Sequence, residues 1–324
     1  MAYCSRLVGF GGYLPEKIVT NQELSQSVDT SDEWIRERTG IKQRHVISGN
    51  ESCNSMAAAA AQQAMDYAGL TPDDIDAIVV ATCTPDQVFP TTAARVQQIL
   101  GVKKGFAFDI SSACAGFVFG LSVADNFIRN GQAKNVLLIG SEVYSRILDW
   151  SDRRTCVLFG DGAGAVILSA EEITTAPIQQ GILGVYLHTD GHHSNLLYVD
   201  GVPSKTGDTC FLKMHGQEVF RHAVSKLSEV VEEALTIHNL THDDIDWLVP
   251  HQANLRIISG MGKKLNLPSD RVIATVDRHA NTSAASVPLA LNEAVRDGRI
   301  KKGDLIVIEA LGGGLSWGSS IIRL

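Results

Sequence analysis

The sequence contains the segment Leu70-Thr71-Pro72-Asp73-Asp74-Ile75-Asp76, and 170 positions later it contains Leu240-Thr241-His242-Asp243-Asp244-Ile245-Asp246. Each copy follows a segment with apolar residues at helical spacing, and each precedes a short apolar segment typical of a buried strand. The same predicted order of helix, turn and strand, repeated at a fixed interval, indicates an internal duplication. We therefore expect two similar α/β units packed together.

The repeat extends beyond these two segments. Asp109 before Cys114 corresponds to Asp277 before Asn281, and the glycines and strand of 162–168 correspond to 312–324. Each half is expected to read helix, strand, helix, strand, helix, strand, strand. We predict two domains, 1–171 and 172–324, with the join near residues 171–180.

Composition favours a large enzyme-sized core and excludes some partners. Of the 324 residues, 44% are hydrophobic and 20% charged, and the net charge is -8. An acidic chain without a basic run argues against nucleic acid or an anionic membrane as the main partner. The six cysteines form no C-x-x-C pair, and no stretch approaches 18 uninterrupted apolar residues. We therefore expect a soluble, cytoplasmic protein. We expect no bound metal, because the histidines of loop 188–207 lack a matching set of ligands elsewhere.

Cys114 is the first candidate for chemistry. The apolar run 105–110 before it is typical of a buried strand, and residues 115–128 after it have helical spacing. At such a strand-to-helix turn, free N–H groups and the helix dipole favour a thiolate, and small neighbours let a carbonyl approach. Cys114 is therefore a candidate nucleophile, although this stretch alone is equally consistent with a buried small hydrophobic residue.

The second half supplies polar groups at the corresponding turns. His251 directly follows a buried-looking strand, and Asn281 is expected at a strand-to-helix turn that mirrors the turn of Cys114. Equivalent turns of two packed halves face one interface, so the three side chains can converge. Gly312-Gly313-Gly314 allows backbone N–H groups to point into the same site, where one of them joins the amide of Cys114 as an oxyanion hole.

Near the N-terminus, Thr30-Ser31-Asp32-Glu33 has the form of a capping box, with Thr30 as the N-cap of a short helix. This helix places Trp34 and Arg38 four residues apart on one face, where an aromatic ring and a cation can hold a flat, phosphorylated ligand. Spacing alone also fits a surface helix with one packed tryptophan.

With these residues in view, the chain resembles the thiolase-fold condensing enzymes, and most closely the β-ketoacyl-acyl carrier protein synthase III family. The resemblance covers essentially the whole length and implies a thiolase-like fold, two duplicated α/β halves packed as a layered α-β-α-β-α structure. The matching motifs are Asp29–Ile35, Arg38–Ile41, Asp109–Gly116, Phe159–Ala165, His251–Asn254 and Asn281–Ser286.

The resemblance implies a two-stage reaction that starts fatty-acid synthesis. Cys114 takes an acyl group, expected to be acetyl, from coenzyme A, and the acyl-enzyme then condenses with malonyl-acyl carrier protein as CO2 leaves. His251 and Asn281 donate hydrogen bonds to the malonyl thioester oxygen, and the amides of Cys114 and Gly313 form the oxyanion hole. Coenzyme A enters as a thioester substrate, and no further cofactor is implied.

The same resemblance assigns the contacts with the substrates. Trp34 and Arg153 hold the adenine of coenzyme A between them, with Arg38 near the phosphates. A cationic patch binds the acidic carrier protein. Phe89 reaches across a homodimer interface and closes the acyl pocket of the partner. The patch consists of Arg256, Lys263, Lys264 and Arg221.

Three other functions compete with this interpretation. A related acyltransferase passes the acyl group from Cys114 to an alcohol or amine without condensation, but it has no enolate for His251 and Asn281 to stabilise. A cysteine hydrolase also uses Cys, His and Asn, yet the full-length duplication does not suit it. A non-catalytic carrier-binding or scaffold protein needs none of the three residues.

Overall fold

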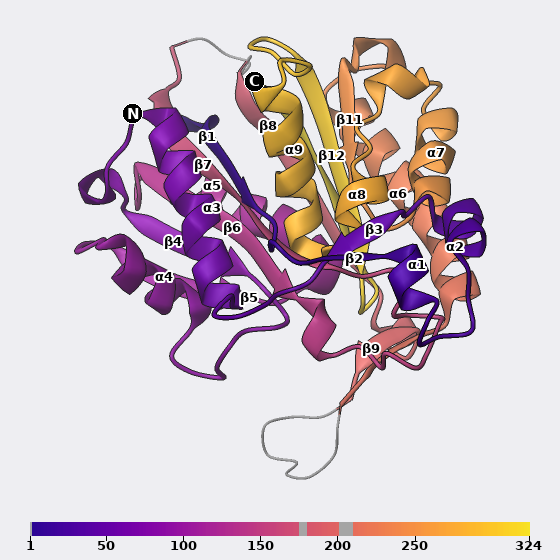
Figure 1. Ribbon diagram of the computed structural model, residues 1–324. Helices are drawn as coiled ribbons and strands as arrows, with labels where there is room; N and C mark the ends of the chain where they lie inside the picture. The colour runs from indigo at the N-terminus through magenta and orange to yellow at the C-terminus, as the bar shows by residue number, and fades with distance from the viewer. Residues whose placement is uncertain (1, 175–179, 201–209) are drawn as a thin grey trace.

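The computed structural model describes residues 2–174, 180–200 and 210–324. These residues form five layers in the order α-β-α-β-α, which confirms the thiolase-like arrangement expected from the sequence (Figure 1). The five-stranded first sheet has the order β1 (Tyr3–Tyr13), β7 (Asp161–Glu172), β6 (Asn135–Val143), β4 (Ala77–Ala81) and β5 (Phe106–Ile110). The four-stranded second sheet has the order β11 (Trp247–Pro250), β12 (Leu305–Gly312), β13 (Ser316–Arg323) and β8 (Gly181–Thr189).

The helices cover both faces of each sheet. Two helices, α5 (Gly116–Arg129) and α9 (Ser286–Arg296), lie between the sheets. The outer layer of the first sheet consists of α3 (Cys53–Ala68) and α4 (Thr92–Leu100), and that of the second of α6 (Gly216–Ile237) and α7 (Leu255–Lys264). The smaller elements are α1 (Asn21–Leu24), α2 (Asp32–Thr39), α8 (Val276–His279) and the strand pairs β2 (Ile18–Thr20) with β3 (Gln43–His45) and β9 (Leu197–Val199) with β10 (Leu212–Met214).

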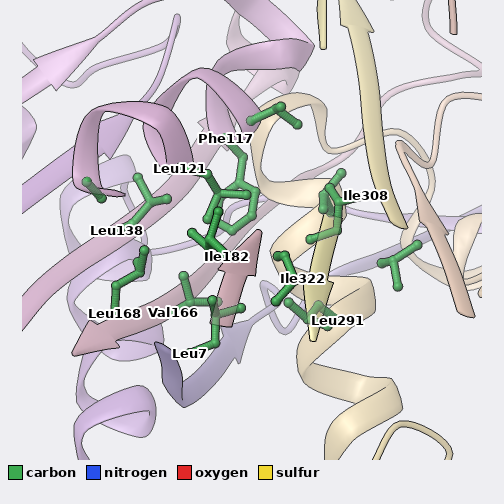
Figure 2. Close-up of a cluster of buried hydrophobic side chains, with 14 of the residues drawn as sticks. Leu7, Phe117, Leu121, Leu138, Val166, Leu168, Ile182, Leu291, Ile308 and Ile322 are labelled. Carbon is green, nitrogen blue, oxygen red and sulfur yellow. The ribbon is translucent and has the colours of Figure 1, made fainter. Parts of the chain in front are cut away.

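The core between the two sheets joins the halves. Figure 2 shows Phe117 and Leu121 from α5 in the same cluster as Leu291 from α9 and Ile308 from β12. Each such side chain contributes about 1.5–3 kcal/mol when it leaves water, so this shared core resists separation of the halves. Two further apolar clusters lie beneath the outer helices, one on each side.

The duplicated segment has the same structure in both copies. The backbone N–H of Thr71 donates to the Asp74 carboxylate over 2.8 Å, and that of Thr241 donates to Asp244 over 2.7 Å. Both segments form a one-turn 3-10 helix with a capping box. The internal repeat is therefore visible in the backbone as well as in the sequence.

Two sequence expectations about the repeat need correction. The second half has no full counterpart of β5 among the described residues, because a single bridge from Leu248 to Val272 and the helix α8 occupy that place. Just before the two central helices, Ala113 and Ser283 have similar positive φ angles of 45° and 52°, and they are 170 positions apart. The counterpart of Cys114 is therefore Ala284, and Asn281 precedes a helix as part of a one-residue bridge rather than following a strand.

Two smaller expectations also differ from the structure. The strand before Cys114 is the half-buried edge strand β5 instead of a buried one. The predicted boundary at 171/172 falls at the end of β7, and residues 175–179 of the predicted join lie outside the described residues, so the division into two domains stays a prediction. Across the described ranges, every helix is too short or too polar to cross a membrane.

Candidate active site

Cys114 lies in the one-turn helix η2 (Ala113–Ala115), between the end of β5 and the first residue of α5. Only 3% of the residue is exposed. The turn is tight, because Ala113 has a φ of +45°. This geometry places the sulfur at the N-terminal end of a central helix, as the sequence pattern indicates.

The thiol nevertheless does not favour ionisation, in contrast to the expectation from the helix dipole. Burial raises the pKa of Cys114 to about 11, and the negative charge of Glu142 adds to this, although a hydrogen bond from Ser283 acts in the opposite direction. Desolvation therefore outweighs the helix end in the free protein.

Gly312 keeps the amide of Cys114 open. A Cβ atom at position 312 would lie 2.6 Å from the Cys114 backbone nitrogen, so any side chain there would cover this N–H group. The same glycine ends β12, and the turn to β13 continues through Gly313. The glycine run thus lies against the nucleophile's amide, as an oxyanion hole requires, while the role of the Gly313 amide stays a prediction.

His251 directly follows β11, and its backbone N–H donates to the carbonyl of Glu309 over 2.8 Å. Its Nδ1 lies 2.6 Å from the hydroxyl of Ser286, the first residue of α9. Burial lowers the pKa of His251 to about 3, so the ring is neutral at physiological pH. A Ser286 hydroxyl that donates to Nδ1 leaves the proton on Nε2, and we infer this tautomer for the site.

Asn281 is fixed on both sides of its backbone. Its N–H donates to the Leu158 carbonyl over 2.9 Å, and its carbonyl accepts from Gly160 over 3.0 Å. The side-chain oxygen accepts from the backbone N–H of Ser283 over 2.9 Å. The NH2 group is therefore the part of this amide that is free to donate to a ligand.

The structure brings these three predicted residues together. Cys114, His251 and Asn281 all line one cavity of about 100 Å³. Most other lining residues are apolar and come from β9, β10, α6 and α7, including Leu197, Met214, Phe220, Ala223, Leu227 and Ile257. The cavity can therefore hold a small acyl group or a slender thioester arm beside the candidate nucleophile and the two candidate donors.

A wider groove of about 1000 Å³ continues from this cavity to the surface. The two spaces share Leu158, Met214, Gly216, Phe220 and Asn254. The groove is polar at its outer end, where its walls include Trp34, Arg38, Arg154, Arg221 and Arg256. A long ligand with an anionic outer end and an apolar inner arm fits this sequence of environments.

Trp34 lines the groove and has two arginine side chains close to its ring. The guanidinium of Arg38 is 4.6 Å from the centre of the Trp34 ring, and that of Arg153 is 5.4 Å away. Arg153 is held by the carbonyl and carboxylate of Asp29. The helix that carries Trp34 begins one residue later than predicted, because Ser31 rather than Thr30 is the N-cap.

The predicted cationic patch is exposed around the same opening. Arg221 and Arg256 line the groove, and Lys263 lines a neighbouring hollow together with Arg36 and Arg256. Lys264 is exposed at the end of α7. Arg154 lines the groove and Arg36 lines the neighbouring hollow, and neither was among the predicted substrate contacts.

Phe89 lies outside the cavity of its own chain. It is 82% exposed, on the loop between β4 and α4, and its neighbour Val88 is 64% exposed. Such exposure of two adjacent apolar side chains is unusual in a monomer. The position is compatible with the predicted role in a partner subunit.

Sequence reasoning missed several buried residues that position the site. Ser286 lies within a recognised motif, but its contact with a histidine 35 residues away has no signal in spacing. The side chain of Gln252 accepts from the N–H groups of Thr275 and Val276 and fixes the segment that follows His251. Glu142 and Ser283 form a third contact, which connects the two halves behind Cys114.

Comparison with known proteins gives consistent results. Residues 108–191 match the family model described as 3-oxoacyl-[acyl-carrier-protein] synthase III, and residues 235–324 match the model of its C-terminal part. A β-ketoacyl-[acyl-carrier-protein] synthase III of Granulibacter bethesdensis is 60% identical over 320 residues, 99% of each chain. The crystal structure of 3-oxoacyl-[acyl-carrier-protein] synthase III from Aquifex aeolicus superposes with a TM-score of 0.92 at 43% identity, and the match covers 99% of this chain and 100% of that one.

A second solved structure broadens this comparison. The priming β-ketosynthase of the R1128 polyketide pathway has a TM-score of 0.94 at 34% identity, and the match covers 100% of this chain and 97% of that chain.

Proposed function

Because this chain belongs to the β-ketoacyl-acyl carrier protein synthase III family, we propose that it uses Cys114, His251 and Asn281 to perform the initiating condensation of fatty-acid synthesis. The enzyme is an acyltransferase: it moves an acyl group from coenzyme A to its cysteine and then joins it to malonyl-acyl carrier protein with loss of CO2. Acetyl is the proposed acyl group, which makes acetoacetyl-acyl carrier protein the product.

In the first stage, the Cys114 sulfur attacks the thioester carbonyl of the acyl-coenzyme A. The developing oxyanion accepts hydrogen bonds from the backbone N–H groups of Cys114 and Gly313. The carbon–sulfur bond to coenzyme A then breaks, which leaves the acyl group on Cys114. Gly312 is essential to this step because it has no side chain to cover the Cys114 amide.

In the second stage, malonyl-acyl carrier protein enters and loses CO2, so that negative charge develops on its thioester oxygen. The Nε2–H of neutral His251 and the NH2 group of Asn281 donate to that oxygen. The resulting enolate carbon attacks the acyl carbonyl on Cys114, and the sulfur leaves. Neither donor has to lose a proton, which suits a histidine whose burial keeps it neutral.

One observation carries this proposal: the proposed nucleophile and both proposed donors line the same cavity, although their positions span residues 114 to 281. A simple acyl transfer to an alcohol or amine has no enolate to stabilise and does not need the two donors. A hydrolase needs water beside the acyl-enzyme, whereas the rest of this cavity is mostly apolar.

The groove supports the proposed binding of both substrates. Trp34 and Arg153 are proposed to hold the adenine of coenzyme A, and Arg38 to bind its phosphates. Arg256, Arg221, Lys263 and Lys264 are proposed to bind the acidic carrier protein on a chain whose net charge is otherwise -8. Both substrates are thioesters on long arms, so no further cofactor is required by the proposal.

We also propose a homodimer that works in the cytoplasm. The exposed Phe89 would enter the partner's acyl pocket, and the half-buried edge strand β5 presents Phe106, which packs against Phe127 with ring centres 4.9 Å apart. An apolar aromatic edge of a sheet is a surface that a second copy can cover.

The test follows the acyl group by intact mass spectrometry. The protein is treated with a panel of acyl-coenzyme A thioesters and then with malonyl-acyl carrier protein, with Cys114→Ser as the matched control. We expect an acetyl adduct at Cys114 that is discharged as acetoacetyl-acyl carrier protein, and no adduct on the variant. Acylation without condensation would favour the acyltransferase function, and no acylation by any thioester would contradict the covalent mechanism.

A further inference from the structure

A buried polar network lies behind Cys114, and the proposed reaction does not yet use it. Its members are Glu142 near the end of β6, Tyr144 just after that strand, and Ser283 in the turn before α9. All three are buried, and none of them lines the cavity that holds the acyl group. The network therefore contacts the nucleophile from the protein side rather than the substrate side.

Glu142 is anchored by the first half of the chain. One carboxylate oxygen accepts from the Thr84 hydroxyl over 2.5 Å and from the backbone N–H of Cys83 over 3.1 Å. The other oxygen accepts from the Ser283 hydroxyl over 3.1 Å, across the boundary between the halves. A carboxyl group with no exposed surface is thus fixed in place and points one oxygen at Ser283.

Ser283 connects this carboxyl group to the nucleophile. Its hydroxyl lies 2.9 Å from the Tyr144 hydroxyl, and the turn that carries Ser283 packs against the turn that carries Cys114. Both hydroxyl groups act on the Cys114 thiol in the direction that lowers its pKa. A serine hydroxyl donates one hydrogen bond and accepts others at the same time. It can therefore accept the thiol proton while it gives its own proton to Glu142.

The energetics favour a single negative charge in this network. Burial raises the pKa of Glu142 to about 7, and burial together with the Glu142 charge raises that of Cys114 to about 11. Release of the thiol proton to water beside an ionised Glu142 would leave two neighbouring buried anions. Transfer of the proton to Glu142 instead keeps the number of buried charges at one.

The other titratable groups around this pair stay neutral near neutral pH. They are Cys53 on α3, Cys83 after β4, Tyr144 after β6 and His251 after β11. Desolvation raises the pKa of Cys53 and of Cys83 to about 12 and that of Tyr144 well above its ordinary value. Burial lowers the pKa of His251 to about 3. Only Glu142 and Cys114 therefore exchange charge in this range.

We propose that Cys114 and Glu142 share one proton through the hydroxyl of Ser283, and that Glu142 holds this proton while Cys114 carries the acyl group. When the sulfur bonds to the thioester carbon, its proton passes to Ser283 Oγ and the Ser283 proton passes to Glu142. The bond to coenzyme A breaks, and the released thiolate takes a proton from water. When Cys114 later leaves the condensed product, its sulfur recovers the stored proton by the reverse path.

Glu142 acts through Ser283 and does not touch the substrate, so it is a positioning residue. The acyl part of this cycle rests on the proposed function, whereas the proton sharing does not. Formation of the Cys114 thiolate requires the shared proton to move to Glu142. The reactivity of the Cys114 sulfur should therefore follow the titration of the pair, and not that of a single thiol.

The test measures the rate at which iodoacetamide alkylates Cys114 between pH 6 and 9.5. Peptide mass spectrometry separates Cys114 from the other five cysteines. In the wild type, we expect the alkylation rate to rise about tenfold per pH unit up to about pH 7 and then to level off. Above that pH the pair of Cys114 and Glu142 holds one proton, so the fraction of Cys114 present as thiolate no longer depends on pH. In Glu142→Gln, the rate should keep rising, and at pH 8.5 it should exceed the wild-type rate about tenfold.

Glu309→Gln is the matched control, because Glu309 is a second fully buried carboxyl group in the other half of the chain. This variant should keep the wild-type profile. A wild-type rate that continues to rise tenfold per unit from pH 7 to 9 would overturn the proposal, and this readout does not depend on whether any variant folds. Absence of acylation by acyl-coenzyme A would instead contradict the proposed function and leave the alkylation profile to decide the proton sharing.

Discussion

His251 can serve as a hydrogen-bond donor because its other ring nitrogen is occupied. Ser286 holds Nδ1 at 2.6 Å, and the Ser286 oxygen also accepts from the backbone N–H of Gln252 over 3.3 Å. That second bond leaves the serine proton free to point at the histidine. A buried imidazole that is neutral and held in one tautomer presents its Nε2 proton to the cavity without any change in charge.

Replacement of Ser286 by alanine should impair the second stage more than the first. Without the hydroxyl, the ring loses the contact that fixes its tautomer, so we expect discharge of acyl-Cys114 by malonyl-acyl carrier protein to slow about tenfold or more. Acylation of Cys114 should change little. Single-turnover mass spectrometry of the two stages measures both rates, and equal slowing of both would contradict this role.

The last residue of β12 controls access to the nucleophile's amide. Gly312 pairs with Ser316 at the end of the β12–β13 ladder, and its missing side chain leaves room against the Cys114 nitrogen. The strand's own hydrogen bonds fix this approach. The proposed oxyanion site therefore depends on how the second sheet ends as well as on the turn that carries the cysteine.

Gly312→Ala should reduce acylation of Cys114 by about a hundredfold, because a methyl group 2.6 Å from the amide nitrogen blocks the donor or displaces the turn. The matched control is Gly191→Ala, since a Cβ atom there has open space within 4 Å. Burst acylation by acetyl-coenzyme A measures the loss. Normal acylation of the Gly312 variant would show that the Cys114 amide is not needed.

Helix α7 is proposed to present the carrier-protein contact. Arg256→Glu should raise the KM for malonyl-acyl carrier protein about tenfold at low salt, while leaving acylation by acetyl-coenzyme A closer to normal, and the difference should shrink at high salt. Lys302→Glu is a matched control, because Lys302 is exposed near the opposite end of β12 from the cavity. Equal effects of both variants would indicate only the change in net charge.

The duplication, visible in turn residues and apolar spacing, predicted two similar packed α/β units and the convergence of Cys114, His251 and Asn281. The layered fold was predicted from the family resemblance. The patterns misidentified the residue of the second half that corresponds to Cys114. Asn281 was chosen by its residue type, whereas the backbone conformation makes Ala284 the equivalent residue. The high pKa of Cys114 could not be predicted from a helix end alone. It depends on the burial of the thiol and on the charge of Glu142, and neither is visible in the residues next to Cys114 in the sequence.

The stability of the whole molecule should depend on a buried acid that the reaction does not use. Both oxygens of Glu309 are buried with no hydrogen-bond partner within the described part of the chain, and burial raises its pKa to about 8. Between the ordinary pKa of about 4.3 and pH 8, the native state keeps a proton that the unfolded chain has lost. The free energy of unfolding therefore falls as pH rises through this range.

Glu309→Gln should remove this component. We expect the variant to match the wild type near pH 5 and to be more stable near pH 8, by on the order of 2 kcal/mol, because glutamine cannot ionise. Thermal unfolding midpoints at the two pH values give the comparison. A difference between the proteins that is the same at both pH values would contradict a raised pKa as its cause.

The assembled enzyme is expected to be a dimer, with a mass about twice the 34.9 kDa of one chain. Phe89→Ala should leave the dimer intact in sedimentation velocity but widen the partner's pocket, so that hexanoyl-coenzyme A acylates Cys114 about tenfold better relative to acetyl-coenzyme A. Val88→Ala, at the adjacent exposed residue, is the control. An unchanged ratio of the two substrates would separate Phe89 from acyl selection.

The cavity of Cys114 and the outer groove meet at a neck formed by Leu158, Met214, Gly216, Phe220 and Asn254. Under the proposed function, acyl-coenzyme A and malonyl-acyl carrier protein both reach the sulfur through this neck. The cavity beyond the neck has a volume of only about 100 Å³, so under the proposed function we expect free coenzyme A to depart before the carrier's arm enters. A single passage therefore implies a ping-pong order of the two substrates. An excess of either thioester should then slow the reaction by occupying the passage that the other needs.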